Sequence, residues 1–113
     1  MGAREGIFRR RTVPGGKKPL GEIATDVLFE NERVKVWNLV VEPGESSAWH
    51  YHQRDYVTMV VEGGGLTVEY EDGTTEAGSS KVGDWRYHGE HRVHRVLNHT
   101  ATRYKNVLIE IKR

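Results

Sequence analysis

The chain has 113 residues, with 17 basic and 16 acidic side chains, six histidines and no cysteine. This length predicts one folded domain with a modest hydrophobic core. The lack of cysteine excludes disulfide scaffolds, cysteine-based zinc sites and thiol nucleophiles. The sequence has no run of 18 apolar residues and no charged start followed by an apolar segment, so we expect a cytoplasmic protein that does not enter a membrane.

The basic charge is concentrated at the start of the chain. Residues 1–20 carry six basic side chains and one acidic one, a net charge of +5, whereas the rest of the chain carries 11 basic and 15 acidic side chains. We divide the chain into a basic arm over residues 1–22 and a domain over residues 23–113. We expect the arm to dock on a partner subunit. Nucleic-acid binding is the weaker alternative, because no basic stripe with interleaved aromatic residues follows the arm.

After the arm, the pattern predicts β-strands. Residues 33–41 are rich in β-branched and aromatic side chains, and residues 56–61 form a nearly continuous apolar run. Residues 66–71 alternate between apolar and polar, and the Asp72-Gly73 pair that follows is typical of a hairpin turn. The remaining predicted strands are 85–88, 94–97 and 103–111. Short strands separated by glycine turns, without a helical stripe, predict an all-β sandwich or small barrel.

The histidines fall into two groups. His50 and His52 are two residues apart, a spacing that puts both imidazoles on one face if they lie on a strand. His88, His91 and His94 come later, and distant strands can be neighbours in a barrel. Imidazole binds Zn, Cu, Fe and Ni, so a shared metal ion is one interpretation. Ordinary hydrogen-bonded strand histidines are the other.

The surroundings of these histidines resemble the cupin superfamily, specifically its small single-domain members. Two cupin motifs are present in order, with the expected internal spacing, at Gly44, His50, His52 and Gly63, and then at Gly83, His94 and Asn98. The resemblance covers about residues 30–112 and implies an antiparallel double-sheet β-barrel, or jelly roll. Residues 49–57 and 107–112 are also similar to small cupins of β-alanine degradation, which is a weaker resemblance.

The resemblance also implies a divalent transition metal, Fe, Mn, Ni or Zn, bound by His50, His52 and His94. Tyr56 stands where the family usually has a glutamate ligand. The neighbouring Asp55 would point away from the site on an uninterrupted strand, and a loop or bulge would reverse this. We therefore expect three histidine ligands, with Tyr56 or Asp55 as an open choice for a fourth.

Other candidate site residues lie near the two histidine groups. Tyr56 and His88 are the predicted catalytic residues, as a hydrogen-bond donor or general acid and as a proton shuttle. An inward-facing Arg86 would bind a carboxylate in a bidentate manner. The predicted substrate pocket comprises Trp49, Asp55, Thr58, Arg86, His91 and Asn98.

We therefore predict metal-dependent chemistry, of the oxygenase, isomerase or lyase type, on a small carboxylate-bearing metabolite. A module that binds a small ligand without catalysis, with or without metal, is the alternative. Val57, Met59 and Val61 alternate with Thr58 and Val60, which are expected to face inward. Since this strand would then be covered on both faces, we also predict a homodimer.

Overall fold

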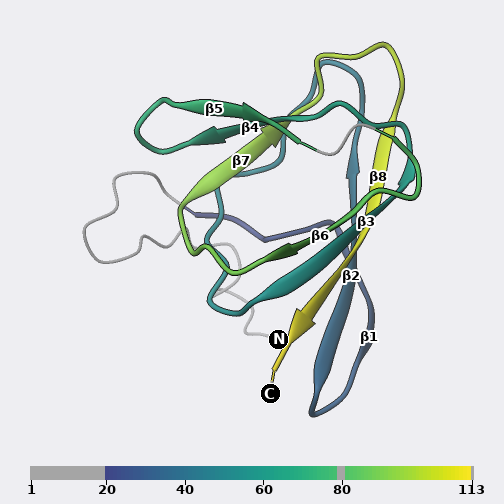
Figure 1. Cartoon of the computed structure of the whole chain (residues 1–113), viewed down its shortest axis with the longest axis vertical. Coiled ribbons are helices and arrows are strands. Elements are labelled where there is room, and N and C mark those ends of the chain that lie inside the picture. The colour runs from purple at the N-terminus through teal and green to yellow at the C-terminus, as the bar shows by residue number, and fades with distance from the viewer. Residues whose placement is uncertain (1–19, 79–80, 113) are drawn as a thin grey trace.

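The computed structural model describes residues 20–78 and 81–112 (Figure 1). This part of the chain contains eight β-strands and no helix. The strands are β1 (Asp26–Glu30), β2 (Val34–Val41), β3 (Tyr56–Glu62), β4 (Thr67–Tyr70), β5 (Thr75–Ala77), β6 (Trp85–His88), β7 (His94–Leu97) and β8 (Tyr104–Ile111). They form a five-stranded sheet in the order β1-β2-β8-β3-β6 and a three-stranded sheet in the order β5-β4-β7, with antiparallel pairing throughout. The predicted all-β, double-sheet fold is confirmed.

The hydrophobic core lies between the two sheets. On β8 every second residue is buried, beginning with Tyr104, because successive side chains of a strand point to opposite faces. Trp37 and Leu39 of β2 and Val60 of β3 cover the same inner face. Leu66 and Val96 pack against them from the side of the three-stranded sheet.

Two strands were not predicted, for different reasons. All five residues of β1 are exposed, and a bulge between Val27 and Phe29 interrupts the two-residue period by which a strand is recognised. β5 has only three residues and forms the second half of the hairpin predicted at Asp72-Gly73. Gly73 adopts φ 91°, a left-handed conformation that favours glycine at this turn.

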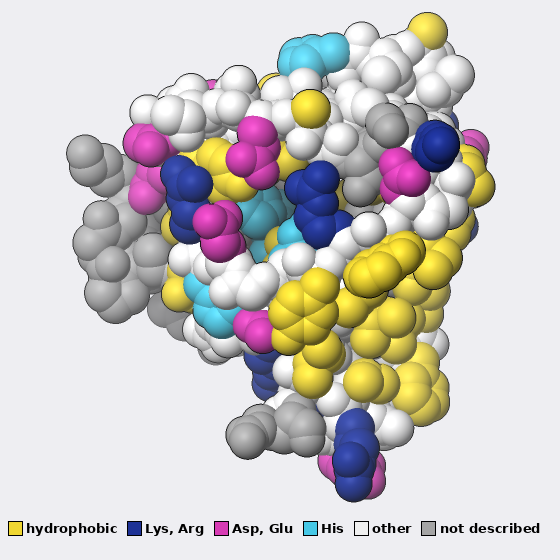
Figure 2. Space-filling view, in the orientation of Figure 1, with side chains coloured by type: hydrophobic (Ala, Val, Ile, Leu, Met, Phe, Trp, Pro, Cys, Tyr) yellow, Lys and Arg dark blue, Asp and Glu magenta, His cyan; other side chains and the backbone are white. Residues whose placement is uncertain are grey.

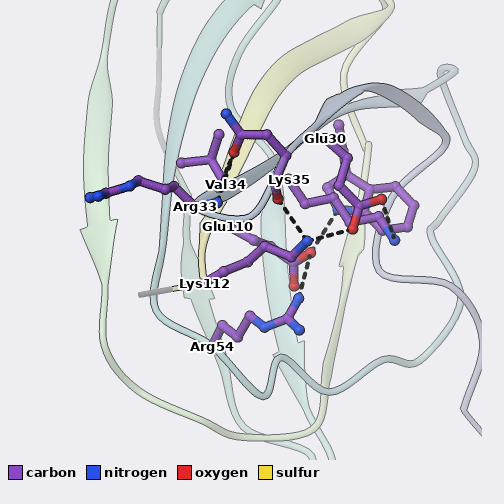
Figure 3. A network of polar contacts seen from close by, with 9 residues as sticks. Glu30, Arg33, Val34, Lys35, Arg54, Glu110 and Lys112 are labelled. Carbon is purple, nitrogen blue, oxygen red and sulfur yellow. Dashed lines mark hydrogen bonds and ion pairs between the residues drawn. The ribbon is translucent and has the colours of Figure 1, made fainter.

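A polar network ties the end of the five-stranded sheet to the segment that follows His52 (Figure 3). The Trp37 indole Nε1 donates to Glu110 Oε1 at 2.8 Å, and Arg54 lies 3.9 Å from the same carboxylate oxygen. Lys112 Nζ donates to Glu30 Oε2 at 2.7 Å, which joins the end of β8 to β1. The ion pair of Arg54 with Glu110 thus links the segment after His52 to β8.

The end of the predicted arm packs against the segment before His50. The Gly21 N–H donates to the Trp49 carbonyl at 2.7 Å, and Leu20 is buried. A Cβ on Gly21 would lie 2.6 Å from the Ala48 Cβ, so only glycine allows this close approach. Residues 1–19, with the docking or nucleic-acid binding predicted for them, lie outside the described residues. Within the described part, no helix is long and apolar enough to cross a membrane.

Candidate metal centre

Three histidines from two segments converge in the wall of the barrel. His50 lies between β2 and β3 and pairs with His94, the first residue of β7, through backbone hydrogen bonds of 2.9 and 3.0 Å. His52 follows two residues later. One potential ligand nitrogen from each of the three imidazoles lies within 4.8 Å of the other two.

The expected strand geometry of this pair differs from the structure. Residues 51 and 52 are not in a strand, and His50 takes part only in an isolated bridge. The imidazoles of His50 and His52 nevertheless lie close, with ring centroids 5.0 Å apart. The backbone bridge between His50 and His94, two residues far apart in the sequence, brings the group together, and strand alternation does not.

Burial keeps these imidazoles neutral. His50 and His52 are each 2% exposed. Burial lowers the pKa of His50 to about 4, that of His52 to about 2 and that of His94 to about 3. All three are therefore unprotonated at neutral pH, the state in which imidazole binds a metal ion.

The hydrogen bonds of the group fit a metal ion. His50 Nδ1 lies 2.8 Å from the Ala48 carbonyl, which can only accept, so Nδ1 carries the proton and Nε2 keeps a free lone pair. His52 Nδ1 is buried and has no hydrogen-bond partner among the described residues. A buried ring nitrogen without a partner is costly, and a cation bound at Nδ1 itself would remove that cost. Three neutral imidazoles form a donor set that suits divalent Zn, Cu, Fe or Ni.

Tyr56 stacks between two histidines. Its ring centroid is 3.8 Å from that of His52 and 4.3 Å from that of His88, with interplanar angles of 17° and 5°. Burial raises the pKa of the Tyr56 phenol well above its ordinary value of 10. The side chain that replaces the usual carboxylate ligand is therefore a neutral hydrogen-bond donor.

His88 is held by a neighbouring hydroxyl. Its Nε2 lies 2.9 Å from Thr58 Oγ1, and the two residues are on adjacent strands β6 and β3. Burial, with a smaller contribution from the Arg86 charge, lowers the pKa of His88 to about 4. His88 is thus neutral at pH 7, in a fixed orientation, and can accept or pass on a proton.

These residues line a cavity of about 240 Å³ between the sheets. In Figure 2, histidine side chains lie in a hollow between basic side chains, with acidic groups at its edge. The charged residues that line the cavity are Arg86, Arg92, Glu76 and Glu90. The Arg92 guanidinium is already engaged, 3.7 Å above the Tyr70 ring and 3.5 Å from Asp72. Within residues 20–78 and 81–112, Arg86 makes no ion pair.

Known structures show the family. A cupin domain from Bordetella pertussis Tohama I is 36% identical, with 87% of this chain and 100% of that chain covered and a TM-score of 0.71. The chain belongs to the cupin family. An RmlC-like cupin protein with a double-stranded β-helix fold from Methanocaldococcus jannaschii shares the fold at 16% identity, covering 91% of this chain and 87% of its own, with a TM-score of 0.65.

Another similar structure is that of a sugar phosphate isomerase of the cupin superfamily from Silicibacter pomeroyi DSS-3. It is 21% identical, with 72% of this chain and 52% of that chain covered and a TM-score of 0.53. At this identity the likeness concerns the fold alone. No protein-family model and no curated protein sequence matches this cupin.

Several residues that were predicted for the pocket do not line the cavity of this cupin. Asp55 accepts hydrogen bonds from the Tyr87 hydroxyl at 2.6 Å and from His91 Nε2 at 3.1 Å. This cluster lies at the surface, because residues 53 and 54 bend the chain before β3 and no strand continues from His52. Asp55 is therefore not part of the three-histidine group, and His91 lies beside it.

Asn98 and Trp49 also lie outside the cavity lining. The Asn98 amide donates to the carbonyls of Val41 and Thr102, at 2.9 and 2.8 Å, and accepts from Thr100. Its hydrogen bonds thus shape the turn between β7 and β8. The Arg95 guanidinium lies over the Trp49 ring, 4.7 Å from its centroid. Of the predicted pocket residues, Thr58 and Arg86 line the cavity.

Sequence reasoning missed some of the lining. Tyr70, Glu76 and Asn106 all border the cavity. Asn106 carried a signal, since it shares the alternation of Leu108 and Tyr104 on β8 and is thus a polar side chain on an apolar face. The Tyr70 hydroxyl donates a hydrogen bond to Glu76 Oε2 at 3.0 Å across the β4–β5 hairpin. The sequence pattern did not indicate which face of this hairpin points to the cavity.

Proposed function

We propose that this cupin binds a divalent transition-metal ion, Fe, Mn, Ni or Zn, through His50, His52 and His94, and acts on a small carboxylate-bearing metabolite. One observation carries the proposal: three neutral imidazoles offer ligand nitrogens within 4.8 Å of one another in the wall of a cavity. The cavity volume of about 240 Å³ limits the substrate to a small molecule. Isomerase, oxygenase and lyase chemistry are the candidate reaction types, the first also found in the cupin from Silicibacter pomeroyi.

In the proposed reaction, each residue around the three histidines has a separate role. A metal ion, when bound, supplies Lewis-acid activation of a coordinated oxygen. The Tyr56 phenol, neutral because of its burial, donates a hydrogen bond or a proton to the substrate. His88, held by Thr58 and unprotonated at neutral pH, accepts a proton. Arg86 binds the substrate carboxylate at the cavity.

Replacing Arg86 tests the substrate class. We expect Arg86→Gln to raise the Kd of small carboxylates such as butyrate at least 10-fold, because a charge-assisted hydrogen bond is worth about 1.5–3 kcal/mol. Calorimetric titration of the metal-loaded protein measures this. Arg95→Gln is the matched control, since Arg95 is held by Glu69 at 2.8 Å and by Trp49. Equal carboxylate affinity in wild type and Arg86→Gln would contradict the assignment.

A binding module without catalysis is the second candidate. Tyr56 favours it, because a neutral phenol stands where a carboxylate would otherwise contribute charge to the metal site. The two candidates differ in turnover. Metal-loaded protein that binds a small carboxylate but leaves it unchanged, in air and under anaerobic conditions, would support the binding module.

We also infer a homodimer, from the outer face of the five-stranded sheet. One row of directly paired residues crosses all five strands and is apolar throughout: Phe29, Val36, Ile109, Val57 and Tyr87. In the next row Met59 pairs with Trp85, and these side chains are 46% and 66% exposed. Figure 2 shows hydrophobic side chains gathered over this sheet. The first row carries no charged side chain, and the second carries one only at its end on the edge strand, Asp26 of β1. Most of this face is therefore apolar and matches a second copy of itself.

Sedimentation velocity at micromolar concentration tests the dimer. Wild type is expected to sediment as a dimer and Trp85→Glu as a monomer, because the variant would bury a charge in the interface. Val82→Glu is the control, as Val82 is 61% exposed and precedes the turn into β6. A monomeric wild type would contradict the inference.

A further inference from the structure

Asn106 is a polar side chain in an apolar part of the cavity. It lies on the inner face of β8, directly opposite Leu39 of β2 and Val60 of β3. It is 4% exposed and lines the cavity. Its neighbours on the same face of β8 are Tyr104 and Leu108. Within this packing the amide serves one polar contact, with the buried hydroxyl of Tyr104.

The Asn106 amide uses only part of its hydrogen-bonding capacity. Nδ2 donates to the Tyr104 hydroxyl at 3.0 Å, but Oδ1 is buried and has no partner among the described residues. In the same part of the chain, the other buried side-chain atom without a hydrogen-bond partner is His52 Nδ1. A buried acceptor is costly to leave unpaired, and native proteins pair nearly all of them. Asn106 lines the cavity, so a small rotation of its side chain would bring Oδ1 to a bound molecule that supplies the missing donor.

The apolar neighbours of Asn106 favour a neutral hydrogen-bond donor on the ligand over a charged one. At the level of Asn106 the flanking strands contribute Leu39 and Val60, so a ligand ammonium would be buried there without a counter-charge. The acidic residues that line the cavity come from elsewhere, Glu76 from β5 and Glu90 from the segment after β6. A neutral hydroxyl can donate to Asn106 Oδ1 without that cost.

We propose that Asn106 determines specificity by accepting a hydrogen bond from a ligand hydroxyl, so that the cavity selects a small hydroxy acid. The carboxylate part of this assignment rests on the proposed function, through Arg86. By the strand register, Arg86 lies two strands and one two-residue step from Asn106. At ~4.8 Å per strand and ~3.3 Å per residue, the two Cα atoms are about 12 Å apart. Both side chains point inward, and a ligand of a few carbon atoms bridges the remainder.

Calorimetric binding of 4-hydroxybutyrate and butyrate to the metal-loaded protein tests the proposal. We expect wild type to prefer the hydroxylated probe at least 10-fold. Asn106→Leu, which is similar in size and lacks the acceptor, is expected to bring the ratio of the two Kd values to about 1. Tyr104→Phe, which leaves Oδ1 in place, is the control and should keep the preference. A purely structural role of Asn106 would change both affinities together and leave their ratio unchanged.

Each outcome decides the proposal. An equal affinity of wild type for the two probes overturns it, because a trapped water would then satisfy Oδ1. A preference that survives in Asn106→Leu also overturns it, because another group would then recognise the hydroxyl. Failure of the proposed function has a different signature, in which wild type binds neither carboxylate. The comparison is then made with butan-1-ol and 1-fluorobutane, followed by the NMR signal of the Asn106 side-chain amide. These probes need neither Arg86 nor a metal, and the absence of a preference for the alcohol overturns the proposal.

Discussion

Replacing His94 by alanine is expected to remove stoichiometric metal from the protein. The substitution leaves two of three converging imidazoles, and we expect the metal affinity to fall at least 100-fold, beyond the 10- to 100-fold loss typical of residues that only orient ligands. Elemental analysis after separate reconstitution with Fe, Mn, Ni and Zn measures the effect. His99→Ala is the matched control, because His99 is exposed and lies outside the group.

The fold should survive this change. The link between His94 and His50 is made by backbone atoms, which alanine retains. His52→Ala provides a second variant, since His52 Nδ1 has no hydrogen-bond partner among the described residues and the substitution breaks none there. Circular dichroism and a thermal melt verify folding in each case. Equimolar metal in folded His94→Ala or His52→Ala would refute the metal site.

Replacing Gly63 by alanine is expected to be the most destabilising change at a motif glycine. Gly63 has φ 73°, a conformation that costs a residue with a side chain roughly 1–2 kcal/mol. Its Cβ would also overlap the Arg103 carbonyl oxygen, which is backbone and lies next to the start of β8. The pairing of β3 with β8 must then shift, so we expect a total loss of about 3–4 kcal/mol in the free energy of unfolding.

Gly44→Ala separates the two causes. Gly44 has φ 81°, but a Cβ there would meet no atom within 4 Å, so only the conformational cost of about 1–2 kcal/mol applies. With about 4–8 °C of Tm per kcal/mol, Gly44→Ala should lower Tm by about 4–16 °C and Gly63→Ala by about 12–32 °C. Equal losses of Tm in the two variants would mean that the contact with Arg103 is not the decisive factor.

Much of the fold could be read from local patterns. The apolar runs of β2, β3 and β8 and the turn at Asp72-Gly73 predicted strands that the structure contains. β1 escaped prediction because its bulge breaks the period and its residues are exposed, so that pairing with β2 alone makes it a strand. The local sequence pattern shows which residues of a strand face the core. It does not predict a strand that forms only because a neighbouring strand pairs with it.

The candidate site divides in the same way. Residue types and motif spacing sufficed to single out His50, His52 and His94, because cupin ligands occupy regular positions along the chain. Spacing did not show that Asp55 turns to the surface, where Tyr87 and His91 bind its carboxylate. That outcome depends on a bend at residues 53–54 and on a partner more than 30 residues away.

The sequence by itself therefore determined the fold class, the family resemblance and the three histidines. Only the tertiary structure decided that the histidines are neutral, that Tyr56 is a stacked phenol and that Arg86, unlike Arg92, is free of ion pairs within the described residues. It also left Oδ1 of Asn106, a residue that lines the cavity, without a hydrogen-bond partner among the described residues. Periodicity and spacing are properties of the chain, whereas burial and hydrogen-bond partners arise when distant strands pack together.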